Sequence, residues 1–412
     1  MSAADTDVLI VGAGPYGLSL ATQLRHRRVD MRIVGQPMKF WRDMPVGMNL
    51  KSLAFATSIY VPHAGATFPE WCRQQGLEDF EPCTMQSFAA YGMRMQERFL
   101  PDLEDDTVTQ ICAAARGFDV VLSSGGRITA RRVVLATGLS HLARVPDVLR
   151  DLPRELATHT SLLQDYSVFR DKEVAIIGGG ASAIEAGAFV HEAGGQPQVL
   201  IRGERAVFHG RSARVRPLLE RIREPVTVLG TGRRHWILQH VPLAVHFLPE
   251  ARRVRFVQQS FGPASPWWIK DRVQGKIPLH VNSEVIAARP AGGRARLIVR
   301  SDGGAERILE VDHVIAGTGY HADVAKLPYL DPRLSERMVR TAGAPALSMT
   351  FESSVKGFYV VGPLSAMSFG PLFRFVAGAD FTVRSLARHL GGPLAKAQDS
   401  AKRLATSVFR TA

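Results

Sequence analysis

Two glycine-rich turns, each placed between an apolar strand and a helix, constrain the fold of this chain more than any other feature. The first turn, Gly12-Ala13-Gly14-Pro15-Tyr16-Gly17, directly follows the apolar run 8–11 and opens a helical pattern. The second turn, Gly178-Gly179-Gly180-Ala181-Ser182-Ala183, follows the apolar run 173–177 in the same way. A strand, a G-x-G-x-x-G/A turn and a helix in this order are typical of dinucleotide-binding units. We therefore expect an α/β protein with two Rossmann-like dinucleotide-binding domains.

Each glycine of the first turn has its own expected role. Gly12 permits the tight turn, Gly14 lets the backbone approach a pyrophosphate, and Gly17 lets the helix pack close to the strand. The helix N-terminus supplies free N–H donors for that pyrophosphate. The next strand is predicted over 31–34, and Gly35 and Gln36 follow it where an Asp or Glu usually binds the ribose. Gln36 is therefore our candidate for the ribose contact.

The second turn leads to a strand whose end selects the cofactor. A carboxylate at that position favours NAD, whereas an arginine can pair with the 2′-phosphate of NADP. Arg202 stands at the end of the strand 199–201, with Arg205 close behind it. The second site is therefore predicted to bind NADPH. Two sites on one chain predict two cofactors in contact. The partner of NADPH is expected to be a flavin, which accepts the hydride.

Further strands and one long helix are predicted downstream. The apolar segments 132–138, 312–320 and 357–363 each run into a tight turn and indicate buried strands. The stretch Ser368-Phe369-Gly370-Pro371 is expected to lead into a helix from about Leu372 to Leu390. The N-terminus of such a helix suits the electron-rich edge of a reduced flavin.

Composition and charge exclude several classes of protein. Hydrophobic residues make up 46% and charged residues 22% of the 412 residues, which excludes a disordered or fibrous chain. The formal net charge is +13, but the arginines are scattered along the whole chain. We interpret this charge as a solvated surface and expect no nucleic-acid partner.

Neither a membrane span nor metal or disulfide chemistry is expected. No apolar run reaches the roughly 18 residues that cross a bilayer. Residues 1–7 lack the basic and apolar regions of a signal peptide, so a cytoplasmic location is predicted. Cys72, Cys83 and Cys112 form neither a C-x-x-C pair nor a zinc motif.

Five motifs carry a resemblance to a known family. They are the two glycine turns, Phe40-Trp41-Arg42, Ala136-Thr137-Gly138 and Gly317-Thr318-Gly319-Tyr320. With them nearly the whole chain resembles the class B flavin-dependent monooxygenases, which include N-hydroxylating, flavin-containing and Baeyer–Villiger enzymes. The resemblance implies FAD at the first site and NADPH at the second. It also implies that a flavin C4a-(hydro)peroxide oxygenates a small organic substrate, at nitrogen, at sulfur or beside a carbonyl.

The reaction subclass stays open. The segment 312–320 is similar to the D-x-x-x-L-A-T-G-Y stretch of N-hydroxylases but has Ala316-Gly317 where Leu or Phe and Ala would precede Thr318. His159 lies where the Baeyer–Villiger fingerprint has its histidine, without the flanking aromatic residues. Each of the two subclasses is therefore matched only in part.

The expected domain order places the NADPH-binding domain inside the FAD-binding domain. The first part of the FAD-binding domain is predicted over 1–167, the NADPH-binding domain over 168–304, and the second part of the FAD-binding domain over 305–412, with a C-terminal helix and a polar tail after 392. An insert at about 204–280 is rich in arginine and aromatic residues. Ordinary helix packing, a membrane-surface element and a nucleic-acid patch are alternatives for it. Our hypothesis is that it caps the active site and sets substrate choice.

The predicted cofactor-binding residues lie in the turns and strand ends described above, and Lys51 and Ser52 are added because relatives contact the flavin there. They are Gly12, Gly14, Pro15, Tyr16, Gly17, Gln36, Trp41, Lys51, Ser52, Val108, Thr137, Gly138, Gly178, Gly180, Ala181, Ser182, Ala183, Arg202, Gly319, Gly362, Pro363, Ser368, Phe369 and Gly370.

Two residues are candidates for the substrate side of the site. His159 either lines the nicotinamide site or is a structural residue between the domains. Arg374 either pairs with a phosphate or a substrate carboxylate, or is solvated on a helix surface. No catalytic triad or carboxylate pair stands out, which is typical of a reaction driven by its cofactors.

Two other functions remain as alternatives. One is an NAD(P)H:acceptor flavin reductase or oxidase without a C-x-x-C pair. The other is a redox-sensing module that binds nucleotides with negligible turnover. The expected partners are a small-molecule substrate and O₂, and homo-oligomerisation is left open.

Overall fold

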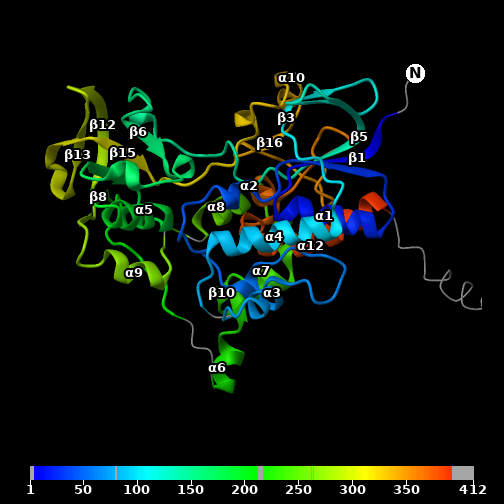
Figure 1. Cartoon of the computed structure of the whole chain (residues 1–412), viewed down its shortest axis with the longest axis horizontal. Helices are drawn as coiled ribbons and strands as arrows, with labels where there is room; N and C mark the ends of the chain where they lie inside the picture. The colour runs from blue at the N-terminus through cyan, green and yellow to red at the C-terminus, as the bar shows by residue number, and fades with distance from the viewer. Residues whose placement is uncertain (1–3, 79–80, 212–216, 261, 263, 392–412) are drawn as a thin grey trace, which may run out of the picture.

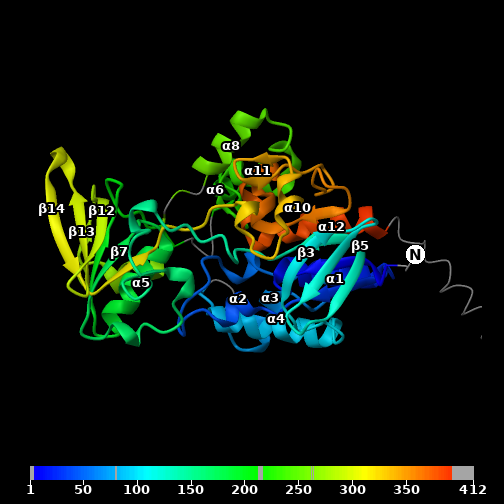
Figure 2. The same cartoon turned by 90° about the horizontal axis from the view of Figure 1, so that it is seen from above.

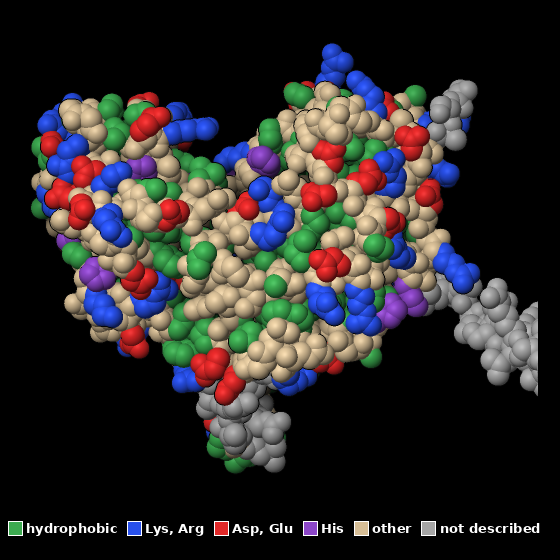
Figure 3. Space-filling model, in the orientation of Figure 1, with side chains coloured by type: hydrophobic (Ala, Val, Ile, Leu, Met, Phe, Trp, Pro, Cys, Tyr) green, Lys and Arg blue, Asp and Glu red, His purple; other side chains and the backbone are tan. Residues whose placement is uncertain are grey.

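The computed structural model describes residues 4–78, 81–211, 217–260, 262 and 264–391. The polar tail expected after residue 392 lies outside these residues. In the part of the chain that is described, no helix is both long enough and apolar enough to cross a membrane. Figure 3 shows that Lys and Arg side chains are spread over the visible face and mixed with acidic ones.

The first sheet is built around β1, with strand order β2-β1-β5-β4-β3 and β18 paired with the end of β5. Strands β1, β2, β5 and β18 are parallel, and β3 and β4 are joined to β5 as an antiparallel extension. The core residues of β1 and β5 are buried, as expected for central strands of a parallel sheet. The strands are β1 (Thr6–Val11), β2 (Met31–Val34), β3 (Val108–Ala113), β4 (Phe118–Leu122), β5 (Arg127–Leu135) and β18 (Phe358–Val360).

Helices cover this sheet, and α1 and α12 pack against each other along its face (Figure 1). Helix α1 begins at Pro15, whose missing N–H is tolerated in the first turn of a helix. Helix α4 lies beside α1, and the short helices lie around the edge of this unit. The helices are α1 (Pro15–His26), α2 (Lys39–Arg42), α3 (Phe68–Gln74), α4 (Met85–Phe99), α10 (Pro332–Glu336), α11 (Ala366–Phe369) and α12 (Ala379–Gly391).

The second sheet is parallel throughout, with strand order β11-β8-β7-β15-β6. Val174 and Ile176 of β7 pack under helices α5 and α9. Ala175 faces the other side, where a three-stranded antiparallel sheet covers it (Figure 2). The elements are β6 (Ala157–His159), β7 (Glu173–Ile177), α5 (Ala181–Glu192), β8 (Gln196–Leu200), α9 (Trp267–Val273), β11 (Leu279–His280), β12 (Glu284–Ala291), β13 (Arg294–Arg300), β14 (Glu306–Val311) and β15 (His313–Ala316).

The expected boundaries at residues 167 and 304 cut through the second sheet. Strand β6 comes before the first boundary and β15 after the second, yet both pair within this sheet. The apolar run 313–316 predicts a buried strand but not the sheet that this strand joins, because both sheets offer a buried parallel neighbour. The division of the chain into domains stays a prediction.

The insert divides between the two units. Leu238, Val245 and Val257 are buried in the core that surrounds the first sheet, whereas Ile269 packs against α5. Figure 2 shows α8 beside α11, on the same side of the molecule as α12. We call residues 226–260 the cap segment. Its elements are β9 (Val226–Thr227), β10 (Gly230–Thr231), α7 (Arg233–His240) and α8 (Glu250–Gln259), preceded by α6 (Leu218–Arg223).

The long helix predicted from Leu372 begins only at Ala379. Residues 371–374 and 376–378 form two separate 3₁₀ turns instead. The hydroxyl of Tyr16 donates to the carbonyl oxygen of Phe375 at 2.9 Å and lies 3.2 Å from that of Phe373. This hydroxyl occupies carbonyl groups that would accept backbone hydrogen bonds in a continuous helix. Because Tyr16 belongs to the first glycine turn, the local sequence around Leu372 could not reveal this contact.

Candidate functional site

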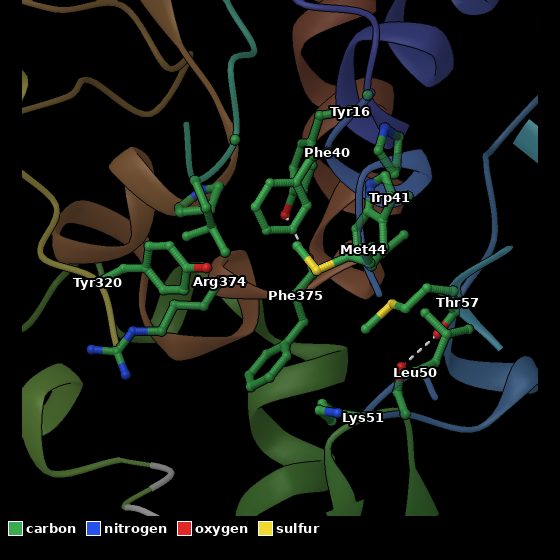
Figure 4. A pocket seen from close by; sticks show the side chains of 18 of the residues that line it. Tyr16, Phe40, Trp41, Met44, Leu50, Lys51, Thr57, Tyr320, Arg374 and Phe375 are labelled. Atoms are coloured by element: carbon green, nitrogen blue, oxygen red, sulfur yellow. Dashed lines mark hydrogen bonds between the residues drawn. The ribbon is translucent and has the colours of Figure 1, made fainter. Parts of the chain in front are cut away.

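A cavity of about 1740 Å³ extends from the first glycine turn to α5 and to the cap segment. Pockets for drug-sized ligands measure roughly 300–1,000 Å³, so this cavity has room for a larger ligand or for two ligands. Figure 4 looks into it, with Trp41 and Met44 on one side, Tyr320 and Arg374 on the other, and Phe375 between them. Among the described residues, no group of three or more His, Cys, Asp or Glu side chains is arranged to hold a metal ion.

The glycines of the first turn fall into two groups, those that packing requires and one that packing does not require. Gly12 has a φ of +111°, and a Cβ on it would lie 2.6 Å from the carbonyl oxygen of Ala136. A Cβ on Gly17 would overlap the carbonyl oxygen of Gly12. Gly14 differs, because its backbone is extended, a Cβ on it would meet nothing within 4 Å, and it lines the cavity. Protein packing does not require a glycine at Gly14, whereas the close approach of a ligand to the N-terminus of α1 would.

The structure brings most of the predicted first-site residues to this cavity, together with one residue of the second turn and Arg374. Those that line it are Gly12, Gly14, Pro15, Tyr16, Gln36, Trp41, Lys51, Ser52, Val108, Thr137, Gly138, Pro363, Ser182 and Arg374.

Gln36 stands exposed at the rim, next to a glycine that packing requires. A Cβ on Gly35 would lie 2.8 Å from the backbone nitrogen of Ala13. Asp106, which sequence reasoning missed, lines the same cavity. Hydrogen bonds from Ser123 and Ser124 lower the pKa of Asp106 to about 2, so its carboxylate stays ionised. Only the position of Asp106 just before Val108 could have drawn attention to it.

An apolar wall forms one side of the cavity. Trp41 lies edge-on to Phe88, with ring centroids 5.0 Å apart, and lines the cavity with its other side. Trp41 therefore both packs against the core and faces the cavity. Met44 and Met48 extend this wall, although no sequence motif pointed to them. Their thioethers adapt to the shape of a ligand and keep water out.

The second glycine turn repeats the geometry of the first. A Cβ on Gly178, which has a φ of +136°, would overlap the carbonyl oxygen of Gly317. A Cβ on Gly317 would in turn lie 2.5 Å from the Cβ of Ala183. Of this turn only Ser182 reaches the cavity. Gly178, Gly180, Ala181 and Ala183 do not line it, and neither does Arg202, which is exposed after β8.

A buried ion pair joins the two units beside the cavity. Glu185 of α5 is fully buried, and its carboxylate accepts a hydrogen bond from the ammonium of Lys51. Arg272 approaches the same carboxylate at 3.7 Å. Burial lowers the pKa of Lys51, while Glu185 opposes that shift. Lys51 thus lines the cavity as predicted, held by a partner that lies 134 residues away in sequence.

The side chain of His159 is held by contacts with residues 161, 319 and 320. It is buried and does not line the cavity. The N–H of Ser161 donates to its Nδ1 at 3.1 Å, so its Nε2–H donates to the carbonyl oxygen of Gly319 at 3.0 Å. Its ring packs edge-on to Tyr320, which does line the cavity. Burial lowers the pKa of His159 and raises that of Tyr320 to about 12.

The predicted flavin-facing turn lies behind the cavity. Ser368, Phe369 and Gly370 are buried and do not line it. Phe369 stacks on His246 of the cap segment, with ring centroids 4.9 Å apart, and a Cβ on Gly370 would lie 3.0 Å from Val245. These residues hold the cap segment. Residues 374–376 face the cavity in their place, and Gly319 and Gly362 also lie outside its lining.

The cap segment itself contributes to the cavity wall. Residues 226–231 and His235 line the cavity, and so do Trp267 and Trp268 farther along the insert. This placement supports the cap hypothesis over a purely structural insert. Whether the cap sets substrate choice stays a prediction.

Comparison with known proteins places the chain in one family. Residues 9–229 match the family model described as pyridine nucleotide-disulphide oxidoreductase. The chain is 28% identical over 278 residues to an FAD-dependent urate hydroxylase of Xanthomonas campestris pv. campestris. That match covers 63% of this chain and 54% of the relative, so the chain spans about half the length of this curated relative.

Solved structures share the fold at low sequence identity. An ornithine hydroxylase of Pseudomonas aeruginosa superposes with a TM-score of 0.75 at 18% identity, covering 94% of this chain and 98% of that one. An ornithine N-hydroxylase of Kutzneria sp. 744, with reduced FAD, NADP⁺ and L-ornithine, gives a TM-score of 0.70 at 18% identity, covering 93% and 98%. The chain therefore has the two-unit α/β fold of these enzymes.

Proposed function

The chain belongs to the pyridine nucleotide-disulphide oxidoreductase family, and we propose that it is an FAD- and NADPH-dependent monooxygenase that oxygenates a small organic substrate. The observation that carries this proposal is the open face of Gly14 at the head of a cavity of about 1740 Å³. A glycine that packing does not need is explained by a pyrophosphate lying against it.

The first site fits FAD. The pyrophosphate would lie on the N-terminus of α1, where backbone N–H groups and the helix dipole favour negative charge. Gln36 and Asp106 at the rim offer polar atoms to a ribose, and Val108 lies beside them. The flavin ring would extend toward Trp41 and Thr137, which line the same cavity. When bound, FAD accepts a hydride from NADPH and activates O₂.

The second site fits NADPH less tightly. Ser182 at the start of α5 and Tyr320 line the cavity, so the nicotinamide end of a ligand on α5 could reach the first site. Tyr320 keeps its proton, since its pKa is about 12, and can donate a hydrogen bond. Arg202, exposed at the end of β8, would meet the 2′-phosphate.

The chain's own residues create conditions that favour oxygenation. Trp41, Met44 and Met48 make one side of the cavity apolar, which would keep water away from the reacting end of a bound cofactor. The placement of Cys72 and Cys83 does not support a disulfide-reductase activity. Cys72 and Cys83 are buried with their sulfurs 3.8 Å apart, and neither lines the cavity.

Labelled oxygen tests the proposal directly. Purified protein is loaded with FAD and NADPH under ¹⁸O₂, with urate as the first substrate because the curated relative is named as a urate hydroxylase. The proposal predicts substrate-stimulated NADPH consumption and label in the product. Hydrogen peroxide alone would indicate an oxidase or reductase, and bound nucleotide without turnover would indicate a sensor.

A further inference from the structure

Among the described residues, one cation that lines the cavity has no carboxylate partner. Lys39 is paired with Asp43 at 2.7 Å, and Lys51 is paired with Glu185. Arg374 also lines the cavity, but its hydrogen bonds within the described residues go only to backbone carbonyl groups. The charge of Arg374 is therefore oriented without being neutralised.

The carbonyl contacts fix the direction of the guanidinium group. Nη1 donates to the carbonyl oxygen of Ser260 at 3.3 Å and Nη2 to that of Val257 at 2.9 Å. Both carbonyls belong to the cap segment, at the end of α8. A guanidinium group has five N–H donors, so three have no partner among the described residues. In Figure 4 the guanidinium lies on the Tyr320 side of the cavity, away from Met44.

The environment makes an unpaired cation costly. Arg374 is half-buried, and burial lowers its pKa. Cations removed from water are normally paired with an anion, since desolvation is otherwise uncompensated. The planar fork of an arginine matches a planar anion such as a carboxylate, with two parallel hydrogen bonds.

We propose that Arg374 binds the substrate, and that this substrate is a planar organic anion whose apolar part lies toward Phe375 and Trp41. The inference rests on the proposed function and adds the class of substrate. It follows from three observations together: a cavity-lining guanidinium, free donors on that guanidinium, and an apolar wall across the cavity. A neutral ligand would leave the charge of Arg374 uncompensated.

A matched pair of probes isolates the charge. Benzoate and benzamide have nearly the same shape, and only benzoate carries the negative charge. Each is titrated into the FAD-loaded protein, followed by the flavin absorption change and, independently of flavin, by calorimetry. We expect benzoate to bind at least tenfold more tightly than benzamide.

Substitutions then locate the effect. Arg374→Gln should weaken benzoate binding about 10- to 100-fold, since it removes the charge-assisted hydrogen bonds between the guanidinium and the carboxylate. Benzamide binding should change less than about twofold, and Arg374→Lys should restore part of the benzoate affinity through its charge. The matched control is Arg253→Gln. Arg253 also ties the cap segment through carbonyl groups, donating to those of Met367 and His246, but it does not line the cavity.

Four results would overturn the inference. They are equal loss of both probes in Arg374→Gln, the same loss in Arg253→Gln, no preference of the unsubstituted protein for benzoate, and a rise in the KM for NADPH in place of weaker benzoate binding. A protein that takes up no FAD contradicts the proposed function. An NADPH-consuming flavoprotein that does not distinguish benzoate from benzamide contradicts this inference alone.

Discussion

The two glycine turns exclude a side chain at the strand–helix crossing in different ways. In the first turn a Cβ on Gly17 would overlap the carbonyl oxygen of Gly12 but would keep an ordinary distance of 3.6 Å from the Cβ of Ala136, which follows β5. In the second turn a Cβ on Gly317, which follows β15, would lie 2.5 Å from the Cβ and 2.6 Å from the Cα of Ala183. The first crossing is therefore closed by the backbone of the turn and the second by Ala183. The glycine at 317 is explained by Ala183 and carries no information about the reaction subclass.

The two turns also differ in how many of their residues line the cavity. Gly14 and its neighbours form part of the cavity wall, whereas the second turn contributes Ser182 alone. A turn that lines the cavity suits a cofactor that stays bound through many turnovers. A turn that lies mostly outside the cavity lining suits a cofactor that enters and leaves in each cycle.

The largest expected effect comes from adding a methyl group where packing forbids it. Gly17→Ala places a Cβ against the backbone carbonyl of Gly12, which cannot yield as a side chain can. We expect a loss of about 3 kcal/mol or more, which for a chain of 412 residues corresponds to a fall in Tm of roughly 3 °C or more. Gly203→Ala is the control, because a Cβ there meets nothing within 4 Å. Equal melting temperatures for the two variants would contradict the packing argument.

The next effect separates binding from folding. Gly14→Val adds its side chain on the open face, where the extended backbone suits a β-branched residue. We expect the FAD-free protein to keep its Tm, while FAD affinity falls at least about 100-fold, or about 2.7 kcal/mol. Thermal melts without FAD and equilibrium dialysis with FAD measure the two quantities. Unchanged FAD affinity would show that no ligand lies against Gly14.

A pair of substitutions tests whether backbone or methyl group limits the space at Gly317. Gly317→Ala alone should lower stability by about 1–3 kcal/mol through overpacking against Ala183. Adding Ala183→Gly should restore little of this loss, because the Cα and N of residue 183 would still lie 2.6 Å and 2.9 Å from the new Cβ and a glycine within a helix costs about 1 kcal/mol. Urea denaturation of the single and double variants gives the coupling energy. Full recovery in the double variant would mean that the methyl group of Ala183 alone excludes a Cβ at Gly317.

Cofactor choice should depend on the exposed end of the second site. Arg202→Glu removes the expected partner of the 2′-phosphate and adds a carboxylate that favours a ribose. We expect the preference for NADPH over NADH, measured as the ratio of kcat/KM, to fall about tenfold, or about 1.4 kcal/mol. The same substitution at Arg205 is the control, and a larger effect there would transfer the role to Arg205.

The smallest effect concerns pH. Tyr329 holds the first strand end by donating to Thr137 at 2.8 Å, and its pKa of about 12 makes this bond insensitive to acid. His159 holds the second strand end, with a pKa lowered by burial. Its neutral form stabilises the fold above the unfolded pKa near 6.5, and this stability is lost as pH falls toward the folded pKa.

Thermal melts between pH 7 and pH 5 check this difference. His159→Asn should reduce the acid-induced fall in Tm by an amount equivalent to less than about 1 kcal/mol. Burial also lowers the pKa of His280 and His313 in the same unit, so the comparison with the unsubstituted protein isolates His159. An unchanged acid response in His159→Asn would assign the effect to those other histidines.

The sequence predicted what local patterns encode. Strands β2 and β7 have the predicted bounds, and the turns begin α1 and α5 as expected. The start of α12 was wrong because the Tyr16 hydroxyl takes up carbonyl groups more than 350 residues away. Met44 and Glu185 could not be found, since only the tertiary fold brings them to the cavity. The composition of the insert drew attention to the region that contains the cap segment. It could not predict that this segment packs against the core around the first sheet.

Titration of the purified protein with FAD tests the central claim most directly. The account predicts stoichiometric uptake with a flavin spectrum that is perturbed by the cavity and bleached by NADPH. Protein that stays colourless in excess FAD, while its circular dichroism shows an intact fold, would contradict the assignment of the first glycine turn as a flavin site.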